Sequence, residues 1–144
     1  MMYLVGFPLL VIPFAIYNII EFVMPGATPG VFWTHTGVSM RLASGADWSL
    51  TAGDLMLTFA ILLLVIELMK STRPTSRTIM DHLLSTLLFV AALMEFLLVK
   101  QAATATFFLL MVVCFVDVVG GYTISIRSAQ RSMQIDGVET IHRG

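Results

Sequence analysis

Long runs of apolar residues, separated by short polar segments, dominate the chain. The runs cover residues 3–24, 52–70, 79–99 and 103–126. A helix needs about 20 apolar residues to cross the ~30 Å hydrocarbon core of a bilayer. The pattern therefore predicts four transmembrane helices in a single membrane domain that covers residues 1–144.

The first run, residues 3–24, contains Pro8 and Pro13 and ends at the turn signal Pro25-Gly26. Prolines are tolerated in membrane helices because neighbouring groups satisfy the freed carbonyls, so we expect a kink rather than a break. A cleaved signal peptide is the competing interpretation. The run has no basic start and no A-x-A site follows it, which favours a first span.

Local signals delimit the other runs. Thr51 and Asp54 have the spacing of a capping box, which predicts that a helix begins near Ala52. The third and fourth runs are joined by the three residues 100–102, a connection short enough to force an antiparallel hairpin of helices. The predicted fold class is an all-α integral membrane protein, built as an antiparallel bundle of four transmembrane helices.

Positive charge predicts the orientation of this bundle. Six of the eight Lys and Arg residues flank one side, in or next to the loop 71–78 and the tail 127–144. The other side has Arg41 and Lys100. Because positive charge near helix ends is retained in the cytoplasm, we expect both termini and the loop 71–78 to be cytoplasmic. The tail is expected to begin as a helical extension of the fourth span and to break at Asp136-Gly137.

The outer loop, residues 25–50, is long for a connection without structure of its own. Val38, Met40 and Leu42 alternate with polar residues, a turn region follows, and the alternation resumes at Asp47. This pattern predicts a short β-hairpin between the first and second helices.

Two functions remain open for the outer loop. It is either a cap that lies on the lipid headgroups, with the two tryptophans as interface anchors, or a docking surface or pore lid. The residues predicted for the docking surface are Trp33, His35, Arg41 and Trp48.

Composition excludes several classes of protein. The chain is 58% hydrophobic and 12% charged, and its mean hydropathy of +0.91 is too high for a soluble domain of this length. A formal net charge of −1 provides no basic surface for nucleic acid. One cysteine excludes an internal disulfide and a Cys-rich metal site. We expect no enzymatic activity, no cofactor and no bound metal, with membrane lipids as partners.

Ionisable residues at membrane depth are candidates for function because burying them is costly. Asp117 lies inside the fourth run, where it is either part of a proton or cation relay or a structural carboxyl bonded to a hydroxyl of a neighbouring helix. Three other carboxylates fall at the predicted outer side, where they form a cation site or remain solvated helix-end charges. The candidate ion pathway comprises Asp117, Glu95, Glu21 and Asp54.

The third run carries a stripe of polar and small residues at four-three spacing, which indicates one helix face directed to the bundle interior. The adjacent glycines of the fourth run allow close helix approach. The predicted helix interface consists of Asp81, Ser85, Ala92, Gly120 and Gly121. A cluster of charged residues is also predicted at the cytoplasmic boundary, formed by Glu67, Lys70, Asp81 and His82.

The stretch DHLLSTLLFVAALMEFLLVKQAATATFFLLMVVCFVDVVGGYTISIRSA, which begins at Asp81, and the segment from Trp48 to Asp54 resemble small four-span inner-membrane proteins of Gram-negative bacteria. The resemblance covers most of the chain and implies a bacterial inner membrane. No known activity comes with it, so it transfers no functional residue.

Two hypotheses of function follow from these patterns. The first is a non-enzymatic inner-membrane protein that acts through helix and loop contacts, as a homo-oligomer or as an accessory subunit of a larger membrane complex. The alternative is a homo-oligomeric cation channel or proton-coupled transporter that uses the intramembrane carboxylates. Four helices enclose little interior volume, so the alternative requires several copies of the chain.

Overall fold

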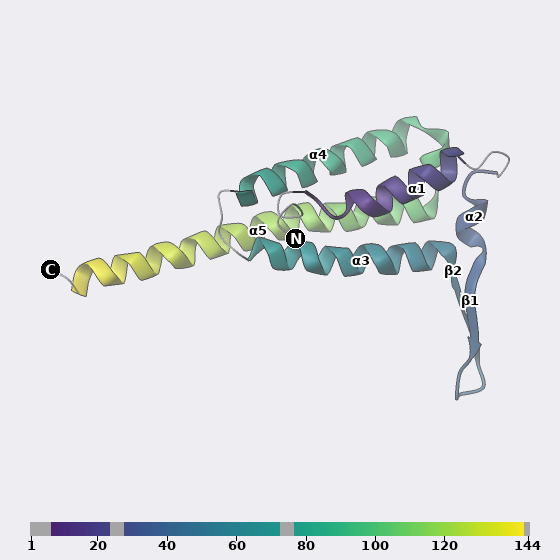
Figure 1. The fold of residues 1–144 in the computed structure, drawn as a ribbon, viewed down its shortest axis with the longest axis horizontal. Coiled ribbons are helices and arrows are strands. Elements are labelled where there is room, and N and C mark those ends of the chain that lie inside the picture. Colours follow the sequence, from purple (N-terminus) through teal and green to yellow (C-terminus); the bar gives the residue numbers. More distant parts are fainter. Residues whose placement is uncertain (1–6, 24–27, 73–76, 143–144) are drawn as a thin grey trace.

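The fold is known from a computed structural model, which describes residues 7–23, 28–72 and 77–142. Its elements are mostly helical, with one pair of strands near the start (Figure 1). In chain order they are α1 (Val11–Val23), α2 (Val31–Thr34), β1 (Thr36–Arg41), β2 (Asp47–Thr51), α3 (Ala52–Ser71), α4 (Arg77–Leu98), the 3-10 turn η1 (Lys100–Ala102) and α5 (Ala105–His142).

Three helices are long and apolar enough to cross a membrane. They are α3, α4 over Met80–Leu98, and α5 over Ala105–Arg131. These helices confirm that the second, third and fourth apolar runs form helices of membrane-spanning length. The first run forms the shorter apolar helix α1, which begins only at Val11. Residues 7–10, predicted as part of the helix, are not helical, so Pro8 precedes the helix and does not kink it. The predicted start at residue 3 lies outside the described residues.

The outward surfaces of the long helices are strongly apolar. Leu62 of α3, Leu87 of α4 and Leu98 at the end of α4 expose 60%, 63% and 76% of their surface. In water, so large an apolar surface promotes aggregation. In the hydrocarbon core of a bilayer the same side chains face a solvent of matching polarity, so the exposure pattern agrees with a membrane location.

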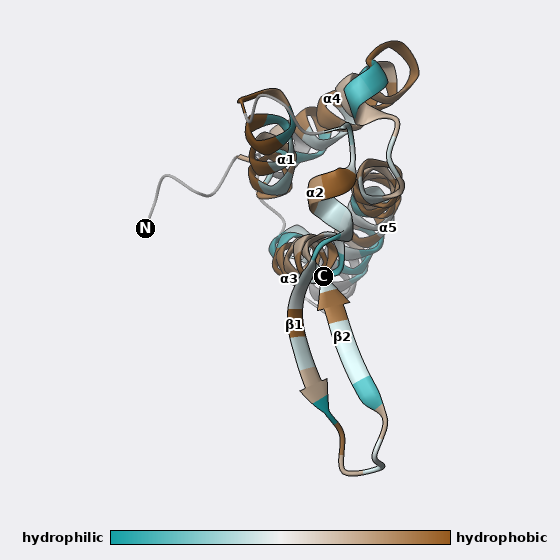
Figure 2. Cartoon of the chain, turned by 90° about the vertical axis from the view of Figure 1, so that its right-hand side faces the viewer, coloured by the Kyte–Doolittle hydropathy of each residue, from teal (hydrophilic) through white to brown (hydrophobic). Residues whose placement is uncertain are grey.

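The helix α5 is the centre of the packing. It lies against both α3 and α4, and the short helix α1 packs on α3 and α5 (Figures 1 and 2). Buried apolar side chains from α1 and α5 fill the space between the helices, with Phe14, Tyr17, Phe107 and Leu110 among the most deeply buried. The bundle has two distinct ends: the hairpin end, with α2, β1, β2 and η1, and the tail end, where α5 leaves the other helices.

The strands β1 and β2 confirm the predicted β-hairpin. They pair antiparallel, with Val38 opposite Leu50 and Met40 opposite Trp48. The turn between them uses Gly45 at φ 83°, a conformation that glycine adopts without steric cost. The hairpin runs across the direction of the helices and extends away from them, as Figure 1 shows.

The helix α3 begins where the sequence predicts. The Thr51 hydroxyl accepts a hydrogen bond from the Asp54 backbone N–H (3.1 Å), and the Asp54 carboxylate accepts one from the Thr51 N–H (2.9 Å). This capping box satisfies backbone donors that the first turn of a helix leaves unpaired. As a result, β2 passes directly into α3 at Ala52.

The tail differs from its prediction, because the helix does not break at Asp136-Gly137. Instead α5 is continuous from Ala105 to His142 and projects past the other helices at the tail end (Figure 1). One glycine inside a helix costs only about 1 kcal/mol relative to alanine, which a long helix tolerates.

Candidate functional site

A buried group of polar side chains lies between α3, α4 and α5 near the tail end, and we call it the tail-end cluster. Three of its members are charged or titratable residues with little exposed surface: Glu67 at 4%, Asp117 at 3% and His82 at 6%. Its residues are Glu67, Lys70, Ser71, His82, Ser85, Asp117 and Ser125.

Glu67 connects the start of the described chain to α3. One carboxylate oxygen accepts a hydrogen bond from the Leu9 N–H at 3.1 Å, and the other forms an ion pair with Lys70 at 3.1 Å. The Lys70 ammonium also donates to the Phe7 carbonyl at 3.3 Å. The segment that precedes α1 is therefore held against the end of α3 by two polar contacts.

Asp117 lies beside a hydroxyl of the neighbouring helix. The Ser85 side chain of α4 is close enough to act on the Asp117 carboxyl as a hydroxyl neighbour, and Glu67 and Lys70 of α3 are close enough to act on it electrostatically. A hydroxyl neighbour of this kind supports the structural interpretation of Asp117. The structure thus brings together Asp117 and part of the predicted boundary cluster, which the sequence analysis treated as separate groups.

His82 occupies a space that a glycine leaves open. Its Nε2 atom forms a hydrogen bond with the Ser125 hydroxyl of α5, and its ring lies 5.1 Å from the Tyr122 ring. A Cβ atom on Gly121 would lie 2.7 Å from Cε1 of the imidazole, closer than real contacts allow. Gly121 therefore permits α5 to approach α4 with the imidazole between them.

The inward face of α4 contains the residues predicted for the middle of the stripe, but not the residue predicted for its first position. Ser85 and Ala92 are each 2% exposed and face the other helices. Asp81 is only half-buried, and His82 takes the inward position beside it. The Asp81 Oδ1 atom is buried without a hydrogen-bond partner among the described residues. Gly120 faces α3 and lies against Leu68.

A second polar group, the hairpin-end cluster, ties α1 to the opposite end of the bundle. The Tyr17 hydroxyl donates to the Gln101 carbonyl at 3.2 Å and lies 2.6 Å from the Thr104 hydroxyl. The Asn18 amide donates to the Glu95 carboxylate at 3.3 Å. The residues of this cluster are Tyr17, Asn18, Glu21, Trp33, Glu95, Gln101 and Thr104.

Glu21 fixes the helix α2 onto the bundle. Its two carboxylate oxygens accept hydrogen bonds from the Gly30 N–H at 2.7 Å and from the Trp33 indole N–H at 3.0 Å. The Trp33 ring stacks on Tyr17 with centroids 4.8 Å apart and is 3% exposed. The structure thus places Trp33 inside the bundle and not on the predicted docking surface, where His35, Arg41 and Trp48 remain exposed.

The four carboxylates of the predicted ion pathway do not lie together in one chain. Glu21 and Glu95 are at the hairpin end, where both act on Tyr17 electrostatically. Asp54 is exposed and caps α3. Asp117 belongs to the other end of the bundle.

An apolar layer separates the two clusters. On the inner face of α5, Phe107, Leu110 and Cys114 are buried between Thr106 and Asp117, a distance of about 16 Å along a helix. Throughout residues 7–23, 28–72 and 77–142, there is no group of three His, Cys, Asp or Glu side chains arranged to hold a metal ion. The geometry gives one chain two separate polar sites.

Replacing Glu21 with glutamine is expected to loosen α2. A glutamine amide has one carbonyl acceptor, so either the Gly30 N–H or the Trp33 indole N–H loses its partner. We expect a loss of about 1–2 kcal/mol in stability. Acrylamide should quench Trp33 fluorescence more strongly, measured in a Trp48→Phe background. Asp54→Asn, a matched change at the same end, should leave Trp33 quenching unaltered; an equal increase in both variants would contradict the assignment.

Comparisons with protein-family models, with curated proteins and with solved structures give no match for this chain.

Proposed function

We propose that the chain is a non-enzymatic, multi-pass protein of a bacterial inner membrane that acts through its helix and loop contacts, as a homo-oligomer or as an accessory subunit of a larger membrane complex. In this proposal α1 completes an antiparallel bundle of four spans, with both termini in the cytoplasm. The three long apolar helices support the membrane part. The uneven distribution of Lys and Arg supports the orientation.

One observation carries the proposal of partner contacts: α5 continues beyond the other helices that the structure describes (Figure 1). From Ser125, which contacts His82, to His142 the helix extends by about 25 Å. Beyond the candidate span, Met133 exposes 69% of its surface. A helix shorter than about 12–15 residues is only marginally stable on its own in water. A partner that packs along the extension would stabilise it.

The two polar clusters support a structural role for the interior. Glu67, Asp117 and His82 each have a partner on another segment, so the tail-end cluster joins α3, α4, α5 and the start of the chain. Hydrogen bonds between membrane helices act as specific contacts because lipid offers no competing donors or acceptors. The clusters fix the shape of the bundle, and the exposed elements remain available for partners.

An ion pathway through Asp117, Glu95, Glu21 and Asp54 receives less support. The buried side chains Phe107, Leu110 and Cys114 separate Asp117 from the carboxylates at the hairpin end. A pathway would then have to run between copies of the chain and not through one bundle.

The mass of the gently solubilised native protein tests the proposal. We expect the full chain to be recovered with further copies or with other membrane proteins, as measured by native mass spectrometry. A chain that ends at Arg131 lacks most of the extension and should lose most of this association. In a Trp48→Phe background, the truncated chain must keep the native acrylamide quenching of Trp33, which reports that the bundle is folded. Recovery of the full chain as a single copy with lipid alone would overturn the proposal, and so would association that the truncation leaves intact.

A further inference from the structure

The two faces of the β-hairpin differ sharply in chemistry. In the pairing of β1 with β2, Val38 lies opposite Leu50 and Met40 opposite Trp48, whereas Ser39 lies opposite Ser49. Since side chains alternate between the faces of a strand, the first two pairs share one face, and the serine pair lies on the other. One face of the hairpin is therefore apolar and the other polar.

Within the described part of the chain, nothing covers the apolar face. The exposed fractions of its side chains are 43% for Val38, 53% for Met40, 42% for Leu42 and 40% for Trp48. A two-stranded hairpin is at best marginally stable in water without packing on one face. This face therefore requires contact with an apolar surface outside the chain.

The position of the hairpin indicates which surface that is. β2 passes directly into α3, whose residues Ala52–Ser71 form a candidate span, so the base of the hairpin lies at the boundary of the bilayer. The hairpin runs across the direction of the helices, so in a membrane crossed by these helices it lies along the membrane plane (Figures 1 and 2).

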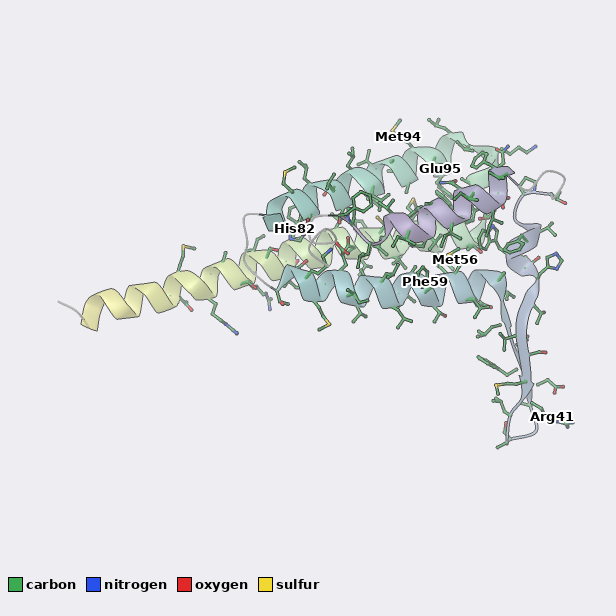
Figure 3. The ribbon with its side chains drawn as sticks, viewed as in Figure 1. Arg41, Met56, Phe59, His82, Met94 and Glu95 are labelled. Carbon is green, nitrogen blue, oxygen red and sulfur yellow. The ribbon has the colours of Figure 1, made fainter. Side chains whose placement is uncertain are left out.

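The apolar face is directed to the membrane side. Figure 3 shows Arg41 at the tip of the hairpin, pointing away from the side on which the helices lie. Arg41 pairs with Asp47 and belongs to the polar face. By alternation, the face with Met40 and Trp48 points toward the side occupied by the helices and by the lipid around them.

We propose that the hairpin lies on the bilayer at the hairpin end, with Val38, Met40, Leu42, Trp48 and Leu50 inserted at the boundary between headgroups and acyl chains. Tryptophan is enriched at this depth because its ring is apolar and its N–H is polar. The occupant of the apolar face is the lipid surface itself. Arg41, Asp47 and the serines then face the water, where they remain accessible to a soluble partner.

A pair of adjacent cysteine substitutions tests the proposal in proteoliposomes of phosphatidylcholine and phosphatidylglycerol. Met40→Cys places a fluorescent label on the apolar face, and Ser39→Cys places the same label on the polar face. The unsubstituted chain serves as the labelling control, because Cys114 is 0% exposed and should not react. A native far-ultraviolet circular dichroism spectrum of each variant reports that the bundle is folded.

We expect nitroxide groups carried on the lipid chains to quench the label at position 40 several-fold more than the label at position 39. Iodide in the water should quench the two labels in the opposite order. Equal iodide quenching at both positions would mean that the hairpin is free in water and would overturn the proposal. A label at position 40 that neither lipid nitroxide nor iodide reaches would also overturn it, because a second copy of the chain would then cover the apolar face.

Discussion

Gly121→Ala is expected to lower the stability of the bundle by about 2 kcal/mol, because the new methyl group would meet the His82 ring. The added Cβ would lie 2.7 Å from Cε1 and 2.8 Å from Nδ1 of the imidazole. The ring is 6% exposed and bonded to Ser125, so it has little space to move. Either α5 must move away from α4 or the hydrogen bond must break. Unfolding in mixed detergent micelles, followed by circular dichroism, measures the loss.

Gly120→Ala is the matched control for this variant. Its Cβ would lie 2.9 Å from a terminal methyl carbon of Leu68, which can change rotamer at low cost. Alanine also has a higher helix propensity than glycine by about 1 kcal/mol. The variant at Gly120 should therefore be as stable as the native chain or slightly more stable. Equal losses at both glycines would show that the His82 contact does not limit the packing of α5.

Glu67→Ala is expected to cost about 2–3 kcal/mol and to release the start of the chain from α3. The change removes the acceptor of the Leu9 N–H and the partner of the Lys70 ammonium. Glu67 is 4% exposed, so the Leu9 N–H would remain buried without a partner. Lys70 is partly exposed and regains water, so its share of the loss is small. Hydrogen exchange at the Leu9 amide should become much faster, together with a lower unfolding midpoint.

Two further substitutions separate the contributions to this loss. Glu67→Gln keeps a carbonyl acceptor for the Leu9 N–H and should lose less stability than Glu67→Ala. Lys70→Met removes the ion pair and leaves the Leu9 contact intact, so exchange at Leu9 should stay slow. Fast exchange at Leu9 in Lys70→Met would assign the anchoring of this segment to the ammonium contact with Phe7 instead.

The long spans, the hairpin and the start of α3 were predictable from sequence because each depends on local signals. Apolar runs of membrane length give α3, α4 and α5. The alternation from Val38 onward gives the strands, and Thr51 with Asp54 gives the cap. Neighbouring residues set all of these features, so a single chain is enough to find them.

The contacts of the two clusters were not predictable in the same way. Tryptophans are common at membrane interfaces, which is why Trp33 was predicted to lie on the surface. Its indole N–H instead donates to Glu21, and its ring stacks on Tyr17; both of these residues lie on α1. At the start of α4, the predicted stripe placed Asp81 inward. One residue corresponds to about 100° around a helix, so the packing turns His82 inward instead. The nearest sequence signal was Gly121, whose missing side chain indicated a close approach but not the residue that fills it.

The continuous helix α5 also sets the direction in which its extension presents each side chain. α5 is one unbroken helix up to His142. The direction in which the Met133 side chain points around the helix axis is therefore fixed by the directions of Asp117 and Gly121 inside the bundle. Each residue adds about 100° of rotation around that axis. The packing of α5 against Ser85 and His82 thus sets the rotation of the whole extension about the helix axis. In the function proposed above, a partner that binds the extension would meet a surface whose orientation is determined by contacts buried within the bundle.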